Sequence, residues 1–446
     1  MVAKKAAART AVLILAGGLA LSGCGGAEGV GGNGEENATE ANVYNNEPVR
    51  LTLYSHNAGF VSDADLETLV TRPVQAKYPN ITVELIDGKS TNLDKMIAAG
   101  ESPDIIATSN YYLYEVLEKG LGTDLSEMIK SHNLDLGKFE PTAVNEMKKF
   151  GKNGEMFGIP YAMNYGVMIY NKDIFDRFGV PYPTDNMTWE EVIDLGRRVT
   201  RADQGVQYIG LDPGSPQSLS RAYSLPVVDE KQEKAVLNSE PYKMIFNLLK
   251  QVYDIPGTVD SQKKYAYGID YVLKEQKLAM HPYWLAALTS RLPQLNESGK
   301  NFNWDIVSYP SFQDKPGIGR EIDFHLAMVP PGSKHKEAAY AVIATMASEE
   351  AQREMNRGTR LTVLNNAELR NEFAMDTKLY EGKNLQGVFK VKPAPLPEAT
   401  PYDVKLYSFL GEGIKSMINE GKDINTVLRE ANEKADKHIE EMKKQE

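Results

Sequence analysis

Short strand-like runs that alternate with helix-like runs constrain the fold of this chain most. VRLTLYSH (49–56) and ITVELIDG (81–88) alternate apolar and polar residues, which predicts two half-buried strands. Between them, residues 62–78 carry apolar side chains at helical spacing, and Pro73 is expected to kink or shorten that helix. PDIIATS (103–109) is a third apolar run. Strands that alternate with helices predict an α/β fold with a parallel sheet.

Polar and aromatic side chains follow two of these strands. Tyr54, His56 and Asn57 lie at the end of the first strand, and Asn110 and Tyr111 follow PDIIATS. In open α/β sheets, ligands bind outside the carboxyl ends of the strands. We therefore expect these five residues to take part in ligand binding.

A second region, over residues 154–201, has the pattern of a turn, two strands and a helix. Thr188 and Glu191 have the spacing of a capping box at the start of that helix. Trp189 lies in the first turn of the predicted helix, so we expect it to pack in a core rather than to bind a ligand.

Seven motifs follow one another along the chain. They are GIPY (158–161), IYNKDIF (169–175), TWEE (188–191), KLAMHPYWLAAL (277–288), IVSYPSF (306–312), FHLAMVPPGSKHKEAAYAVIATMASEEAQREM (324–355) and DINTVLREANEKADKHIEEM (423–442). In this order the motifs resemble family 1 of the extracellular solute-binding proteins of ABC importers, a group that includes the maltodextrin binders. The resemblance covers essentially residues 49–446.

This resemblance implies a two-lobed periplasmic-binding-protein-like α/β fold of type II, with a ligand cleft between lobes that are joined by crossing strands. By motif order, lobe 1 would comprise residues 49–162 and 310–347, and lobe 2 residues 163–309 and 348–446. Closure of the lobes would bury the ligand, and an importer would recognise the closed form. The resemblance also implies a receptor that is not an enzyme and that delivers its ligand to permease subunits driven by a separate ATPase.

The composition favours a sugar as the ligand. Sugars present apolar C–H faces ringed by hydroxyl groups, so a sugar site needs flat aromatic surfaces and fixed polar groups. The chain has 23 Tyr, 13 Phe and 3 Trp, although any single tyrosine is explained equally well by half-buried packing. Trp284 matches the family's stacking tryptophan and carries the strongest case. The expected site residues are Tyr54, His56, Asn57, Asn110, Tyr111, Tyr161, Asn164, Tyr165, Tyr283, Trp284 and Phe324.

Four charged residues leave the charge of the sugar open. Arg320 and Asp323 lie in GIGREID, and Arg357 and Arg360 lie in NRGTRLT. Each motif is either part of the cleft or a solvated surface turn. If one of these arginines points inward, an acidic sugar such as a uronide becomes plausible, because a guanidinium binds a carboxylate at two points.

The N-terminus resembles a bacterial lipoprotein signal. A basic start is followed by an apolar run over residues 11–21, about half the length of a membrane span. LSGC (21–24), which ends in the single cysteine of the chain, resembles a lipobox. This implies a signal peptide over residues 1–23 and acylation of Cys24, with palmitate or a similar chain, as a lipid anchor.

Residues 24–48 are rich in Gly, Asn and Glu and are expected to form a flexible tether. We expect a monomer on the extracytoplasmic face of the cell membrane.

Charge and missing motifs argue against several other classes of protein. The formal net charge of −11 argues against nucleic acid as a partner. The sequence has no cysteine pair, zinc-protease motif, calcium loop or nucleophile elbow, so we expect no metal and no cofactor. Two alternatives stay open. One is a surface-anchored glycan-degrading enzyme, whose paired carboxylates leave no sequence motif; the other is a sugar co-receptor of a sensor kinase.

Overall fold

The computed structural model describes residues 44, 47–60, 63–358 and 360–444. Met1–Glu40 and Ala41–Glu446 form two separate units, and all described residues belong to the second. The expected signal peptide, Cys24 and nearly all of the tether lie outside the described residues. Among the residues that are described, no helix is both long and apolar enough to cross a membrane.

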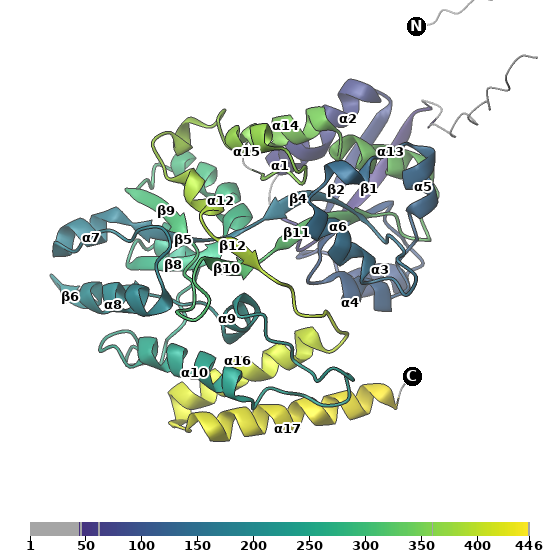
Figure 1. Ribbon diagram of the computed structural model, residues 1–446. Coiled ribbons are helices and arrows are strands. Elements are labelled where there is room, and N and C mark those ends of the chain that lie inside the picture. Colours follow the sequence, from purple (N-terminus) through teal and green to yellow (C-terminus); the bar gives the residue numbers. More distant parts are fainter. Residues whose placement is uncertain (1–43, 45–46, 61–62, 359, 445–446) are drawn as a thin grey trace, which may run out of the picture. The chain divides into compact units, whose positions relative to one another are not determined.

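The first of two five-stranded sheets has the strand order β2-β1-β3-β11-β4 (Figure 1). β1 pairs in parallel with β2 and β3, which confirms the strand–helix–strand prediction for this part of the chain. β11 comes from much later in the sequence and is antiparallel to both β3 and β4, so the sheet is mixed rather than wholly parallel. The strands are β1 (Val49–His56), β2 (Ile81–Asp87), β3 (Ile105–Ser109), β4 (Ile159–Asn164) and β11 (Asp323–Met328).

Eleven short helical segments of the described chain belong to this first lobe. Pro73 is the second residue of α2, and a π-helical turn precedes it, so the expected single helix between β1 and β2 is interrupted there. The segments are α1 (Asp63–Leu66), η1 (Glu67–Thr71), α2 (Arg72–Lys77), α3 (Leu93–Ala98), α4 (Leu113–Glu118), α5 (Ser126–Ser131), η2 (Leu136–Lys138), α6 (Pro141–Lys148), α13 (Lys336–Met346), α14 (Glu349–Gly358) and α15 (Ala367–Asn371).

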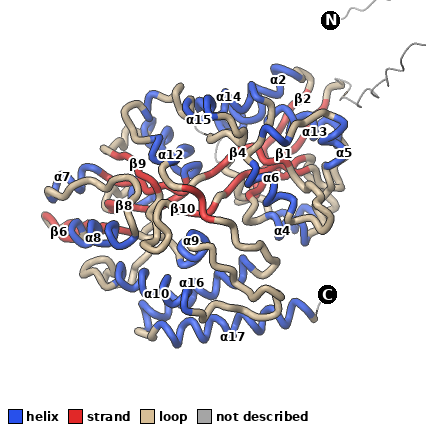
Figure 2. The backbone as a smooth tube through the Cα atoms, viewed as in Figure 1, coloured by secondary structure: helices blue, strands red, loops and turns tan. Residues whose placement is uncertain are grey.

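The second sheet has the order β6-β7-β8-β5-β9, and Figure 2 shows its strands as a group distinct from the first. β7 and β8 are parallel, whereas β5 is antiparallel to both β8 and β9. A separate two-stranded sheet pairs β10 with β12. The strands are β5 (Gly166–Asn171), β6 (Arg201–Asp203), β7 (Val206–Leu211), β8 (Leu278–Trp284), β9 (Trp304–Ser308), β10 (Ile318–Glu321) and β12 (Lys392–Ala394).

The remaining helices complete the second lobe, where α16 and α17 run side by side (Figure 1). The capping box at α8 is confirmed, because the Thr188 side chain accepts from the Glu191 N–H and Glu191 accepts from the Thr188 N–H. The helices are α7 (Lys172–Phe178), α8 (Trp189–Val199), α9 (Pro216–Ala222), α10 (Glu240–Tyr253), α11 (Ile269–Leu273), α12 (Leu285–Glu297), η3 (Lys378–Tyr380), η4 (Leu385–Phe389), α16 (Asp403–Glu420) and α17 (Ile424–Lys443).

The two lobes are joined by chain segments that pass from one sheet to the other. β4 leads through Tyr165 into β5, and β10 leads through Ile322 into β11. These crossings match the crossing strands implied by the family resemblance. The carboxyl end of β4 and the start of β5 therefore lie where both lobes meet.

Two segments lie in the other lobe from the one expected. Motif order predicts residues 310–321 in lobe 1, but β10 pairs with β12 and contacts α9 and β5 of lobe 2. It predicts residues 348–371 in lobe 2, but α14 packs on η1 of lobe 1. In addition, the Glu140 N–H donates to the Val363 carbonyl at 2.8 Å. Motif order places segments along the chain, whereas these assignments depend on packing between segments far apart in sequence.

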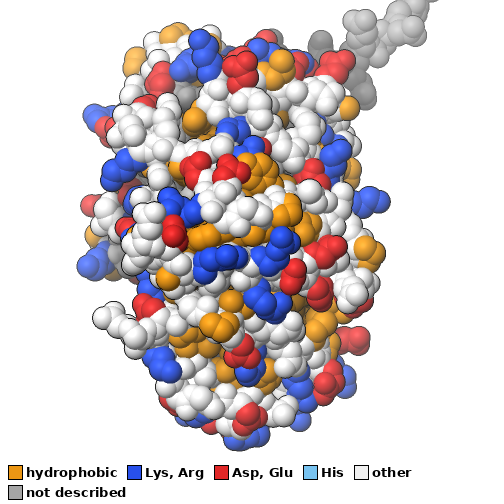
Figure 3. Space-filling model, turned by 90° about the vertical axis from the view of Figure 1, so that its left-hand side faces the viewer, with side chains coloured by type: hydrophobic (Ala, Val, Ile, Leu, Met, Phe, Trp, Pro, Cys, Tyr) orange, Lys and Arg blue, Asp and Glu red, His pale blue; other side chains and the backbone are white. Residues whose placement is uncertain are grey.

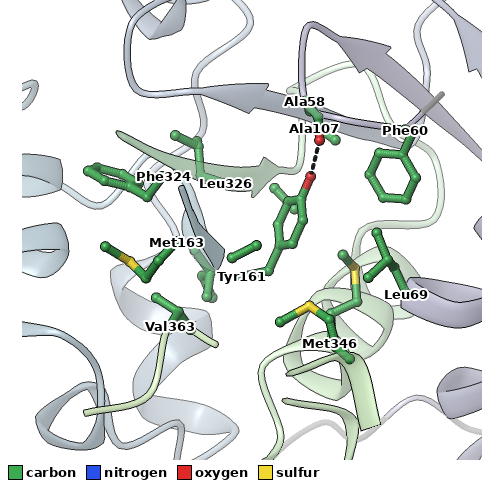
Figure 4. Packing of buried hydrophobic residues seen from close by; sticks show 14 of the residues in the cluster. Ala58, Phe60, Leu69, Ala107, Tyr161, Met163, Phe324, Leu326, Met346 and Val363 are labelled. Carbon is green, nitrogen blue, oxygen red and sulfur yellow. Dashed lines mark hydrogen bonds between the residues drawn. The ribbon is translucent and has the colours of Figure 1, made fainter. Parts of the chain in front are cut away.

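Buried apolar side chains form two clusters. In the first, Tyr161 is 1 % exposed and its hydroxyl donates to the Ala58 carbonyl at 2.9 Å (Figure 4). In the second, Trp189 is fully buried and packs edge-to-face on Tyr309 with ring centroids 5.7 Å apart. The prediction that Trp189 packs in a core is confirmed.

Charges of both signs share the surface. On the face in Figure 3, Lys and Arg side chains are interspersed with Asp and Glu, and hydrophobic side chains form a band near its middle. Many described charges belong to pairs within one helix, such as Lys243 with Glu240 and Lys250 with Asp254. Exposed pairs of this kind add little to stability.

Candidate functional site

Side chains from both lobes line one cleft with a volume of about 550 Å³. The first lobe contributes the ends of β1 and β3 and the segments that follow β2 and β3. The second lobe contributes α9, the end of β8, the start of α12, and β10. A cleft of this size suits a small ligand that both lobes contact.

Seven of the eleven predicted site residues line this cleft. Trp284 and Tyr283 are half-buried at the end of β8, whereas Tyr54 is 2 % exposed and its hydroxyl donates to the Thr91 carbonyl at 2.9 Å. His56 stacks near Tyr54 with ring centroids 6.3 Å apart. The seven are Tyr54, His56, Asn57, Tyr111, Asn164, Tyr283 and Trp284.

Four predicted site residues lie elsewhere. Tyr161 and Phe324 project from β4, at the edge of the first sheet, and from its neighbour β11 into the first core, as Figure 4 shows, because both faces of these strands are covered. Asn110 is buried, and its side-chain oxygen accepts the Phe324 N–H at 3.1 Å, so it ties the end of β3 to β11. Tyr165 packs edge-to-face on Phe389 at the first crossing. These four positions are corrected from expected cleft residues to structural ones.

Arg320 lies directly over Trp284. The carbon at the centre of its guanidinium group is 3.7 Å from the centroid of the indole ring, a cation–π contact. Gly166 makes this contact possible, because a Cβ at position 166 would lie 2.6 Å from the Cβ of Arg320 and 2.9 Å from the Tyr309 ring. The cation–π contact therefore covers part of the aromatic surface and fixes the arginine against it.

A buried polar pair lies beside this wall. Asn164 donates to the Asp323 carboxylate at 2.8 Å, and its oxygen accepts the Ala286 N–H at 3.0 Å. Burial raises the pKa of Asp323 to about 7, with the nearby Glu321 acting in the same direction. Burial also lowers the pKa of His325, whose ring is 3.9 Å from Asp323, to about 3. Near neutral pH, His325 is uncharged and Asp323 is close to its titration point.

Glu321 connects two arginines of the second lobe. Arg221 Nε donates to Glu321 at 2.8 Å and Arg320 Nε donates to the other carboxylate oxygen at 3.4 Å. All three side chains are at least nine-tenths buried. Arg221 also lies over the Tyr111 ring of the first lobe, 5.1 Å from its centroid. Sequence reasoning missed Arg221, since no pattern links positions that are 100 residues apart.

The first lobe supplies a polar wall in which sequence reasoning found His56 but missed its charged neighbours. Lys119 pairs with Asp94 at 2.6 Å, and His56 lies 3.6 Å from Glu115. Gly88 lets the chain pass close to β1, because a Cβ there would be 2.4 Å from the Ser55 carbonyl oxygen. Residues 88–90, Gly-Lys-Ser, therefore form a tight turn in the cleft wall.

A profile of the family described as bacterial extracellular solute-binding protein matches residues 60–353, well over half of the chain. The chain belongs to this family. As a solute-binding protein, it has the two-lobed fold that its sequence motifs implied, with crossing strands at the expected places.

Three proteins similar to this solute-binding protein share low sequence identity with it. The arabinooligosaccharide-binding protein of Bacillus subtilis (strain 168) is 22 % identical over 299 residues, which are 63 % of this chain and 65 % of the relative. The match thus spans less than two thirds of that relative's length. An ABC substrate-binding protein from Listeria monocytogenes, in complex with cycloalternan, has a TM-score of 0.70 at 19 % identity, covering 87 % of this chain and 98 % of that one. The GacH receptor of Streptomyces glaucescens has a TM-score of 0.66 at 16 % identity, covering 88 % of this chain and 98 % of that one. At these identities the similarity establishes the two-lobed fold.

The two arginines of NRGTRLT have different places in this solute-binding protein. Arg360 is 3 % exposed and donates to the Ala286 and Gly59 carbonyls and to the Asp65 carboxylate. Arg357 is partly exposed and pairs with Asp376 at 2.6 Å. Arg360 therefore joins the start of α12 to the first lobe, and Arg357 belongs to the surface.

Proposed function

We propose that this solute-binding protein captures a sugar or oligosaccharide in the cleft. The observation that carries the proposal is the pair of aromatic side chains, Trp284 and Tyr283, half-buried in a cleft whose other walls are mainly polar. An aromatic face binds the apolar side of a sugar ring, and the surrounding amide, hydroxyl and charged groups bind its hydroxyls.

Capture by closure of the lobes is supported by contacts across the cleft. Tyr111 of the first lobe lies over Arg221 of the second, and Asn164 at the crossing binds both Asp323 and the start of α12. A ligand between these walls contacts both lobes at once, so it stabilises the arrangement in which they are close.

Delivery to a membrane importer completes the proposed function. The protein would be a monomer anchored through an acylated Cys24 to the extracytoplasmic face of the cell membrane, and would pass its ligand to permease subunits driven by a separate ATPase. The family description, extracellular solute-binding, supports this location. The sugar ligands in the names of the distant relatives support the ligand class.

A thermal-shift screen of the purified protein tests the ligand class. The panel contains neutral oligosaccharides, oligouronides, amino acids, peptides and ferric citrate. A ligand that binds only the folded state raises the melting temperature, and the rise increases with its concentration relative to the dissociation constant. A shift with a glycan supports the proposal; a shift with peptide or iron and none with any glycan contradicts it.

Two further measurements separate the alternative functions. Incubation with the glycan that binds, followed by chromatography, detects shortened products if the protein is a glycan-degrading enzyme; we expect none. The second measurement is the identity of the neighbouring genes. Two permease genes beside this gene favour import, whereas a two-component sensor kinase and its response regulator without permease genes would favour a sugar co-receptor.

A further inference from the structure

We propose that the sugar carries a carboxylate and that Arg320 binds this carboxylate. This inference rests on the proposed function, because it specifies the chemistry of the same ligand. It starts from the placement of one arginine that the sequence left undecided between cleft and surface.

Arg320 is held in the cleft wall with its hydrogen-bonding capacity largely unused. Its side chain is 9 % exposed and is fixed between Trp284 and the backbone at Gly166. Nε makes the single hydrogen bond that this side chain forms with other described residues, at 3.4 Å to Glu321. The two terminal nitrogens, with four N–H donors, thus have no hydrogen-bond partner among the described residues while Arg320 lines the cleft.

The counter-charge for Arg320 is shared. Glu321 is the carboxylate within ion-pair distance of both Arg320 and Arg221, and it lies closer to Arg221. No arginine among the described residues lies within 4.0 Å of the Asp323 carboxylate, which is bound by Asn164 instead. Within ion-pair distance the two guanidinium groups thus share one carboxylate, while Asp323 and Asp403 interact with these arginines from farther away. Arg320 keeps unused N–H donors in a largely buried place, where unpaired donors are costly, and a ligand carboxylate supplies an acceptor for them.

The charges on the two walls give the ligand an orientation. The cleft residues of the second lobe include Arg221, Arg291 and Arg320 against Glu321 alone. The charged cleft residues of the first lobe are Asp87, Asp94 and Glu115 against Lys89 and Lys119, and Asp323 lies at the crossing beside the Trp284 wall. The second wall carries an excess of positive charge, so an anionic group is attracted to it more than to the first wall. Arg291 is half exposed and already paired with Asp270, so Arg320 is the arginine placed to receive the carboxylate.

The geometry also suits a sugar acid better than a simple anion. Because the guanidinium lies over the Trp284 ring, its free edge is close to the aromatic surface. A pyranose ring on the exposed part of Trp284 or Tyr283 can place a ring carboxylate against that edge. The planar fork of arginine then donates two parallel hydrogen bonds to it.

The test compares matched acidic and neutral glycans by isothermal titration calorimetry on the intact protein. The probes form a matched pair. The acidic one is an oligouronide, for example an oligogalacturonate, and the neutral one is the same oligosaccharide with its carboxyl groups reduced to alcohols. We expect the acidic form to bind about tenfold to a hundredfold more tightly, the range of a charge-assisted hydrogen bond. Arg320→Gln should remove most of this preference, and Arg320→Lys should restore only part, because lysine keeps the charge but not the fork.

The control variant is Arg197→Gln, which removes an exposed arginine of α8 outside the cleft lining, paired with Asp194. It should leave the preference unchanged. The melting temperature of each variant without ligand shows whether it is folded. Neutral forms that bind as tightly as acidic ones, or a preference that survives in folded Arg320→Gln, would overturn this inference and leave the proposed function intact. Absence of binding by every glycan, acidic and neutral, would overturn the proposed function and this inference together.

Discussion

The three tryptophans of the chain differ in what surrounds them. Trp189 and Trp304 are buried at 0 % and 5 % exposure, whereas Trp284 is half-buried in the cleft wall. The same residue type therefore packs in a core at two positions and is available to a ligand at the third. This difference gives a matched comparison at the scale of single residues.

Trp284→Ala is expected to weaken glycan binding by about tenfold or more, because it removes the aromatic face and the support of Arg320. Its melting temperature should change little. Trp304→Ala, the matched core variant, should instead lower the free energy of unfolding by about 3–5 kcal/mol. Calorimetric titration and urea unfolding measure the two effects. An unchanged affinity in Trp284→Ala would contradict the assignment of this residue.

Asp323 should make stability depend on pH. Its pKa is raised to about 7 in the folded protein, above the ordinary value of about 3.9. From about pH 4 to about pH 7 the Asp323 carboxyl therefore holds a proton in the folded state that it has lost in the unfolded state, and its contribution to stability falls as the pH rises through this window. His325, with its pKa lowered to about 3, is neutral in the folded protein but gains a proton below about pH 6.5 in the unfolded chain, so its contribution rises with pH and opposes that of Asp323.

The variant Asp323→Asn removes this titration. Between about pH 5 and about pH 7.5, the wild-type free energy of unfolding should fall by roughly 2–3 kcal/mol more than that of the variant. Urea unfolding at a series of pH values measures the difference. Parallel pH profiles for the two proteins would show that Asp323 does not titrate in this range.

At the scale of elements, Arg360 connects parts of both lobes. Its guanidinium donates to the Gly59 carbonyl and the Asp65 carboxylate of the first lobe and, at 3.2 Å, to the Ala286 carbonyl at the start of α12. The neighbouring Ala286 N–H is bound by Asn164. The start of α12, which directly follows Trp284, is thus fixed from two sides.

Arg360→Ala is expected to lower the free energy of unfolding by about 3–5 kcal/mol, the range for breaking a buried ion pair. Arg357→Ala, three positions earlier, removes a partly exposed pair with Asp376 and should lower the free energy of unfolding far less. Chemical denaturation of both variants measures the contrast. Equal, small effects would mean that Arg360 does not hold α12 against the first lobe.

At the scale of the whole molecule, ligand capture and membrane attachment should be separable. All residues that line the cleft lie after residue 53, whereas the proposed anchor is Cys24. Cys24→Ser should therefore abolish incorporation of a labelled fatty acid and release the protein from the membrane fraction. Its affinity for the glycan should not change. Labelling and membrane retention that persist in Cys24→Ser would contradict the lipobox prediction.

Local features of the fold followed from the sequence because they depend on neighbouring residues. Hydrophobic alternation predicted β1 and β2, the Thr188–Glu191 spacing predicted the capping box, and motif order implied the two-lobed fold. For the candidate site, the residues at the ends of β1 and β8 could be named in advance. A strand end places its last side chains at the edge of a sheet whatever the rest of the chain does.

Other features were decided by tertiary structure. Sequence alone did not place Tyr161 and Phe324 in a core, because whether a strand is covered on one face or both depends on which helices pack there. The antiparallel insertion of β11, the lobe that holds residues 348–371, and the Arg221–Glu321 pair likewise join segments far apart in the chain. Such contacts arise from burial and charge compensation over the whole fold, so neighbouring residues carry no signal for them. For the same reason, the sequence left Arg320 undecided between surface and cleft, and the packing of β10 against Trp284 placed it in the cleft wall.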